Sequence, residues 1–173
     1  MRRRVTRWLP LFVLVVVAGA GAAMAAAAAT TSSTATVRTT TTKTFGTVLV
    51  GPNGHTLYRY TPDKMGGAST CKGICLTYWP KLMVKTGTKP TASGGATAAL
   101  IGTIKAGNGE AQVTYAGFPL YYFSGDKNAG QTNGQGTMKT WYVVNTKGAL
   151  VKQAVKTTSS QTSSSTTSSS AWG

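Results

Sequence analysis

The sequence predicts an all-β domain, built as a small sandwich or barrel from two tandem copies of one unit. The first observation is an internal repeat: residues 54–63 (GHTLYRYTPD) and 117–126 (GFPLYYFSGD) share Gly, Leu, Tyr, an aromatic residue and Asp in one register. The second is that short runs rich in Val, Tyr, Thr and Leu alternate with Gly, Asn and Pro, as strands and turns do. One such unit is too small to cover its own apolar face, so we expect the two copies to share a core.

The chain begins with a segment, residues 1–29, that we expect to be a signal peptide. Four arginines precede an apolar run and an Ala-rich stretch with several Ala-x-Ala sites. The alternative is an uncleaved anchor, because residues 8–29 are almost long enough to cross a bilayer. No cysteine precedes Cys71, so lipidation at an N-terminal cysteine is not expected. The segment predicts a secreted or extracytoplasmic protein with no membrane span once it is removed.

Two segments flank the predicted domain, and both are almost free of apolar residues. Residues 30–44 are rich in Thr, and residues 153–173 are rich in Ser and Thr. Segments of this composition bury too little surface to offset their chain entropy. We therefore expect a disordered linker and a disordered tail, which are solvated spacers or sites of O-glycosylation.

The charge of the chain is strongly positive. The formal net charge is +15, and it falls to +11 when the four arginines of residues 1–29 are left out. The lysines are scattered singly, which argues against sequence-specific recognition of nucleic acid. Anionic polymers of the cell envelope are the partners that this charge favours, although it also serves plain solubility.

The first copy is expected over residues 45–85. Strands are predicted near 45–50, 56–61 and 80–85, with the first two joined by a turn at GPNGH. Residues 69–79 (STCKGICLTYW) predict a turn or two of helix near the cysteines, with Ser69 as the N-cap and Pro80 beyond its end.

The second copy is expected over residues 98–152, after a loop at 87–97. It repeats the plan of the first copy, with the hairpin turn at Ala116-Gly117. Its predicted strands lie near 98–104, 110–115, 118–124, 140–145 and 148–152.

The segments LYRYTPDKMGGASTCKGICLTYWP and QVTYAGFPLYYFSGDKNAGQTNGQGTMKTWYVV resemble the two copies of the bacterial secreted repeat of unknown function. Proteins of that family are also described as predicted lipoproteins with a Tyr-x-aromatic-x-x-Asp motif. The resemblance covers residues 45–150 and implies a bacterial, extracytoplasmic protein without naming an activity. Two departures are the missing lipidated cysteine and Pro80-Lys81, where the family has Pro-Pro.

The repeated motif residues are expected to build the fold. A catalytic or calcium role for Asp63 and Asp126 is the alternative, but Asp126 is the only carboxylate of its Gly-rich loop, and a calcium loop needs several. We expect each Asp to accept hydrogen bonds from loop N–H groups. The motif residues with this expected structural role are Tyr58, Tyr60, Asp63, Trp79, Tyr121, Phe123, Asp126 and Trp141.

Cys71 and Cys75 are expected to form a disulfide, because the protein is exported and four residues span one helical turn. In the second copy their positions hold Gly134 and Met138, so only one copy carries the bond. The alternative is a redox-active pair, or a soft-metal site that also uses methionine sulfur. The usual Cys-x-x-Cys spacing of thiol oxidoreductases is absent.

His55, the only histidine, is expected to be an exposed turn residue. No nucleophile, phosphate-binding or zinc motif is recognisable in the sequence. We therefore expect a non-enzymatic β-repeat protein of the cell envelope without a cofactor or bound metal, whose role is structural or surface-binding. The alternative function is a redox or soft-metal-binding protein centred on Cys71 and Cys75.

Overall fold

The computed structural model describes residues 35–155. The expected signal peptide and the expected tail from residue 156 onward lie outside the described residues. The first copy begins earlier than the expected residue 45 and contains β1 (Thr36–Thr42), β2 (Gly46–Val50), β3 (Tyr58–Tyr60), α1 (Ile74–Tyr78) and β4 (Met83–Lys85). After β5 (Thr91–Ala92), the second copy contains η1 (Ala98–Leu100), β6 (Ile101–Gly107), β7 (Glu110–Tyr115), β8 (Phe118–Pro119), η2 (Thr137–Lys139) and β9 (Trp141–Val143).

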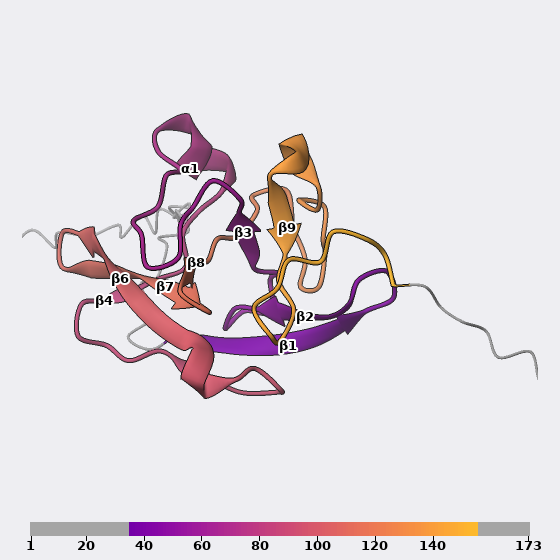
Figure 1. Cartoon of the computed structure of the whole chain (residues 1–173), viewed down its shortest axis with the longest axis horizontal. Coiled ribbons are helices and arrows are strands. Elements are labelled where there is room, and N and C mark those ends of the chain that lie inside the picture. Colours follow the sequence, from indigo (N-terminus) through magenta and orange to yellow (C-terminus); the bar gives the residue numbers. More distant parts are fainter. Residues whose placement is uncertain (1–34, 156–173) are drawn as a thin grey trace, which may run out of the picture. The chain divides into compact units, whose positions relative to one another are not determined.

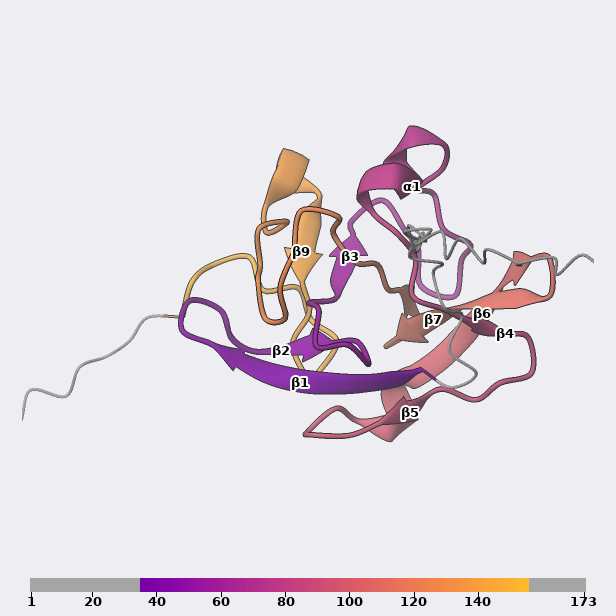
Figure 2. The ribbon, with the colours of Figure 1, turned by 180° about the vertical axis from the view of Figure 1, so that it is seen from behind.

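Each copy contributes one long antiparallel hairpin, as Figure 1 shows. In the first copy β1 pairs with β2, and in the second β6 pairs with β7. The short strand β5 adds to β1 in parallel, which is visible from behind in Figure 2. Strands β4 and β8 extend the second hairpin by pairing with β7. Strand thus predominates over helix in the described part of the chain, as predicted.

The two copies exchange strands at the centre of the domain. Strand β3 of the first copy pairs with β9 of the second, so that Tyr60 lies opposite Trp141. The reverse pairing joins Tyr121 of the second copy to Lys81, which follows the tryptophan of the first. Each copy therefore completes the sheet of the other, and neither contains all of its own strand partners.

The hydrophobic core also contains residues of both copies. One buried cluster contains residues of both copies, among them Leu49, Leu57, Leu120 and Tyr115. A second cluster contains the motif tyrosines Tyr58 and Tyr121 together with both central tryptophans. Because both clusters draw on both copies, the two repeats form one hydrophobic unit.

Several expectations need correction. Strand β1 occupies residues 36–42, so the predicted disordered linker at 30–44 is wrong over these residues. The Thr-rich segment has little apolar content, but Val37 is fully buried and threonine has a high strand propensity. At the other end, Val155 donates its N–H to the Thr44 carbonyl, so the ordered domain continues beyond residue 152.

The remaining differences concern element type. The predicted strand at 98–104 begins with the 3₁₀ turn η1, and the one at 148–152 is reduced to a single bridge at Leu150. The helical turn near the cysteines is present, but Gly73 and not Ser69 precedes it. The all-β prediction is confirmed, with several short sheets and no closed barrel among the described residues. No helix within residues 35–155 is long and apolar enough to cross a membrane.

Candidate functional site

The motif residues of the two copies meet at the centre of the strand exchange. The Tyr58 hydroxyl donates to Asp126 Oδ2 at 2.7 Å, and the Tyr121 hydroxyl donates to Asp63 Oδ2 at 2.5 Å. In each bond the tyrosine and the aspartate come from different copies. The side chains thus pair across the two copies, as strands β3 and β9 do. All four side chains are buried.

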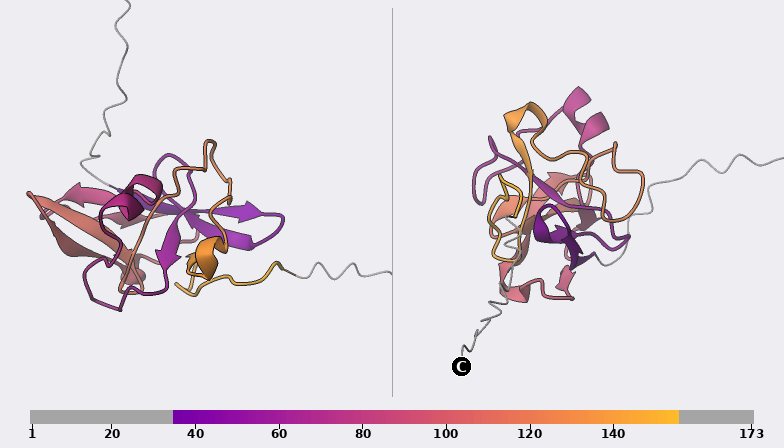
Figure 3. Two further views of the ribbon diagram at one scale, coloured as in Figure 1. Left: turned by 90° about the horizontal axis from the view of Figure 1, so that it is seen from above. Right: turned by 90° about the vertical axis from the view of Figure 1, so that its right-hand side faces the viewer.

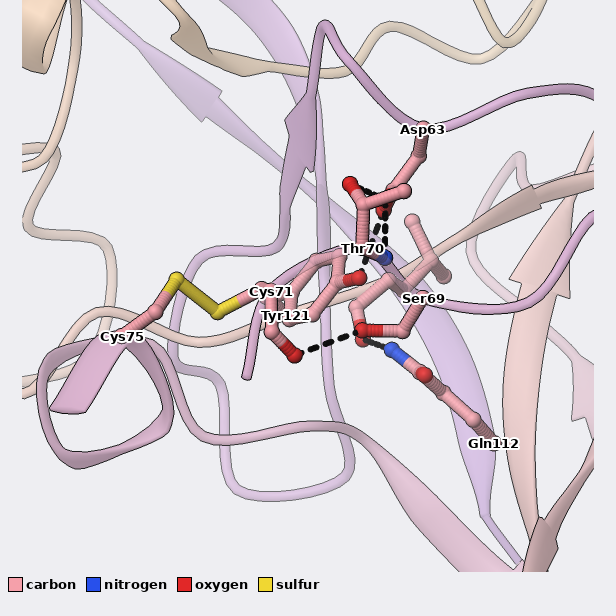
Figure 4. Close-up of a disulfide and its surroundings, with 8 residues drawn as sticks. Asp63, Ser69, Thr70, Cys71, Cys75, Gln112 and Tyr121 are labelled. Atoms are coloured by element: carbon pink, nitrogen blue, oxygen red, sulfur yellow. Dashed lines mark hydrogen bonds between the residues drawn. A yellow bond between two sulfur atoms is a disulfide. The ribbon is translucent and has the colours of Figure 1, made fainter. Parts of the chain in front are cut away.

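Each aspartate also orders the loop that follows it. Asp63 Oδ1 accepts from the backbone N–H of Thr70 at 2.7 Å and from its hydroxyl at 2.6 Å, as Figure 4 shows. Asp126 Oδ1 accepts from the N–H of Asn133 at 2.8 Å. Both contacts span seven residues, so both copies form the same loop. In each carboxylate, both oxygens have hydrogen-bond donors.

Burial changes the acidity of these groups. It raises the pKa of Asp126 above its ordinary value, and the hydrogen bonds from Tyr58 and Asn133 only partly oppose this. Burial also raises the pKa of both tyrosine hydroxyls, and the neighbouring carboxylate raises it further. The tyrosines therefore remain protonated donors at neutral pH, which suits buried hydrogen bonds.

The aromatic side chains form a continuous stack above this centre. Trp79 and Trp141 lie face to face, with ring centroids 3.8 Å apart and an interplanar angle of 1°. Tyr60 stacks on Trp141 with a centroid distance of 4.3 Å, and Phe123 lies on Trp79 at 4.5 Å. The order along the stack alternates between the copies, so the tryptophan pair lies where the two repeats meet.

The two halves differ at the cysteines. Cys71 forms a disulfide with Cys75 of α1, and Figure 4 shows it next to the Tyr121–Asp63 contact. In the second copy Gly134 takes the place of Cys71. A Cβ there would lie 2.8 Å from Trp79 and 2.9 Å from Phe123, so glycine is required by close packing.

Two cationic or titratable side chains lie around the centre. His55 is half-buried, although an exposed turn residue was expected. Its Nδ1 lies 3.1 Å from the Asp126 carbonyl oxygen, so it contacts the loop of the second copy. Arg59 donates to the Gly148 carbonyl at 2.6 Å and lies 3.3 Å above the ring of Phe118. Burial lowers the pKa of Arg59 to about 10, so it remains cationic at neutral pH.

The structure brings all eight motif residues into one centre and leaves His55 at its edge. Sequence reasoning missed Thr70 and Asn133, which were detectable as a second pair at the same offset as the aspartates. It also missed Gln112, which is fully buried and donates to the Leu120 carbonyl at 3.0 Å. Among residues 35–155, no three metal-ligating His, Cys, Asp or Glu side chains gather in one place.

The fold and this centre define a class: an all-β protein made of two intertwined copies of a Tyr–Asp repeat. The family model of the secreted repeat of unknown function matches the chain twice, at residues 39–83 and 102–145. The chain therefore belongs to the family of secreted repeats of unknown function, whose members are extracellular proteins. Both matched segments lie within the described domain and correspond to its two copies. No curated protein and no solved structure matches the chain.

Proposed function

We propose that this protein is a non-catalytic module outside the cell that binds anionic polymers of the cell envelope. The observation that carries the proposal is the separation of charges between surface and interior. Of the 13 Lys and Arg residues in the described part, 11 are exposed, and the other two, Arg59 and Lys81, are half-buried. The protein has three acidic residues, of which Asp63 and Asp126 are buried and Glu110 is half-buried.

Because of this separation, the charged side chains exposed to solvent in the described part are almost all cationic. Charged side chains of opposite sign, which commonly intersperse on protein surfaces, are not exposed here. A surface of one sign attracts polyanions over a distance that depends on ionic strength. The charge is spread over the surface, so it favours a flexible polymer of repeating charge over a small ligand in one pocket.

The central site supports a structural role for the motif. The carboxylates of Asp63 and Asp126 are satisfied by Tyr121, Tyr58 and the loop N–H groups. Neither side chain is more than 5% exposed. A catalytic carboxylate has to reach substrate, whereas these two hold together the copies and their loops.

Binding to purified anionic wall polymer, measured across a salt series, tests the proposal. We expect retention at low salt and a steep loss as salt rises, because dissolved ions screen the attraction between exposed charges. Replacing three exposed lysines, Lys85, Lys105 and Lys147, by Gln should weaken retention severalfold. The matched control replaces three exposed threonines, Thr47, Thr86 and Thr103, by Gln. Failure of the unmodified protein to bind at low salt contradicts the proposal.

The alternative is a redox or soft-metal function of Cys71 and Cys75. The observation that favours it is that Cys75 is only half-buried within the surface helix α1, while Cys71 is 1% exposed. Thiol titration of the folded protein with and without reductant, together with copper analysis, tests this. A pair that cycles readily or binds stoichiometric copper supports this alternative, and a bond that stays closed without metal contradicts it.

A further inference from the structure

The helical turns of the two copies project from one long side of the described domain. Helix α1 ends at Tyr78, directly before Trp79, and η2 ends two residues before Trp141. The two turns project from the same side of the domain, uppermost in Figure 1, with β3 between them in the left view of Figure 3. We call residues 72–78 and 137–139 the α1–η2 tip.

The tip exposes large apolar side chains. Of the five large apolar residues that are exposed in the described part, three belong to it: Ile74 at 73%, Tyr78 at 56% and Met138 at 82%. Single exposed apolar residues are ordinary on protein surfaces, but a group that projects from one side of a domain marks an interaction site. In α1 only Cys75 and Leu76 pack against the core, and no residue of α1 or η2 is fully buried, so Ile74, Tyr78 and Met138 are left to solvent.

The backbone of η2 adds a second observation. Met138 and Lys139 have positive φ angles of 52° and 57°, in the left-handed region that non-glycine residues rarely occupy. Both side chains are exposed, so core packing does not explain this conformation. Strained backbone that core packing does not require is found most often at functional segments.

The charges around the tip indicate what it contacts. Lys72 and Lys139 are exposed within it, and Lys152 lies 5.6 Å above the ring of Tyr142, whose hydroxyl donates to the Lys139 carbonyl. No acidic side chain is exposed in residues 35–155. A second copy of this chain would bring two cationic surfaces together, whereas an anionic surface would neutralise them.

We propose that the α1–η2 tip docks onto the headgroup region of an anionic lipid bilayer. Ile74, Tyr78 and Met138 enter the interface, while Lys72 and Lys139 lie at the level of the lipid phosphates. This combination of shallow apolar insertion and basic flanks is how peripheral proteins bind membranes without spanning them. The inference is independent of polymer binding, which uses the dispersed charge and not the apolar tip.

Vesicle sedimentation tests the docking. The protein is expressed from the full sequence, and mass spectrometry of the purified protein establishes where the chain begins. We expect binding to vesicles of phosphatidylcholine with one-quarter phosphatidylglycerol, and little binding to phosphatidylcholine alone. The variant Ile74→Ser/Met138→Ser should bind at least tenfold more weakly. Lys72→Gln/Lys139→Gln should lose roughly thirtyfold, at about 1 kcal/mol for each lysine.

Matched controls separate docking from general attraction. Val155→Ser removes an exposed apolar side chain beside Thr44, and Lys85→Gln/Lys105→Gln removes two charges from the β4–β7–β6 sheet. We expect both to bind vesicles within about twofold of the unmodified protein. Equal losses in tip and control variants, or no vesicle binding at all, overturn the inference. The urea unfolding midpoint of Ile74→Ser/Met138→Ser shows whether the variant is folded, and its retention on wall polymer, measured alongside, reports polymer binding separately.

Discussion

Tyr58 and Tyr121 pair with each other through their backbones, although 62 residues lie between them. The N–H of Tyr58 donates to the carbonyl of Tyr121 at 2.8 Å, and the reverse bond measures 3.0 Å. Each tyrosine then extends its hydroxyl to the aspartate that belongs to the other's copy. The two repeats are thus related by an approximate twofold arrangement that is centred on this pair.

The buried tyrosine hydroxyls should contribute measurably to stability. Tyr58→Phe or Tyr121→Phe leaves a buried carboxylate oxygen without its donor, so we expect each to lower the free energy of unfolding by about 1–3 kcal/mol. Urea denaturation measures this. Tyr142→Phe is the matched control, because its hydroxyl is at the surface, and it should change stability by less than about 0.5 kcal/mol. Equal effects of all three would contradict the role of the centre.

The stability of the domain should depend on pH through Asp126. Its folded pKa lies above the ordinary 3.8 because burial penalises the charged form. Between these two pKa values the folded chain holds a proton that the unfolded chain has lost, so this group's contribution to stability falls as pH rises through that window. Urea midpoints measured from pH 3.5 upward test it. Asp126→Asn should flatten this part of the curve, and an unchanged slope would show that another group is responsible.

The tryptophan stack should report on the contact between the copies. Parallel rings at 3.8 Å couple their electronic transitions, so we expect an exciton couplet in the circular dichroism spectrum. Trp79→Phe should abolish the couplet and leave the domain folded.

Unfolding should occur in one transition, because the core residues of the two copies interdigitate. Two separate transitions would mean that each copy folds by itself.

Opening the disulfide should weaken the domain without unfolding it. The loop that it closes is short, so its loss should cost only about 2 kcal/mol. The second copy forms the equivalent Asp126–Asn133 contact with Gly134 and Met138 in these positions. Thermal unfolding with and without reductant measures the change, and Cys71→Ala/Cys75→Met should be insensitive to reductant. Complete unfolding on reduction at neutral pH would contradict this expectation.

Gly134 should be intolerant of a side chain. In Gly134→Ala the new Cβ would meet Trp79 and Phe123 at under 3 Å, and such overpacking typically costs about 1–3 kcal/mol. Gly67→Ala is the control, because its nearest neighbour is Lys64 at 3.2 Å in an exposed loop. Denaturation curves for both variants compare the two sites. A larger cost at Gly67 would mean that the stack is less tightly packed than the distances indicate.

Much of the fold was predictable, because strands and turns depend on local patterns. The turn at residues 51–55 and the strand at 110–115 follow from alternating apolar residues and from Gly, Asn and Pro. Strand β1 was not predictable in this way, since its run of threonines has the composition of a linker. Its pairing with β2 and the burial of Val37 make it a strand, and these are tertiary contacts.

The sequence by itself determined that the protein is duplicated and which residues the copies share. It also determined that the cysteines belong to one copy alone, since all these facts are read from the alignment of the two halves. Only the tertiary structure decided that the copies exchange strands, with Tyr58 bonded to Asp126 and Tyr121 to Asp63. The physical reason is that a repeat specifies equivalent surfaces but not whether each contacts its own copy or the other. That choice is made by packing, which here places Trp79 on Trp141 and buries both aspartates between the halves.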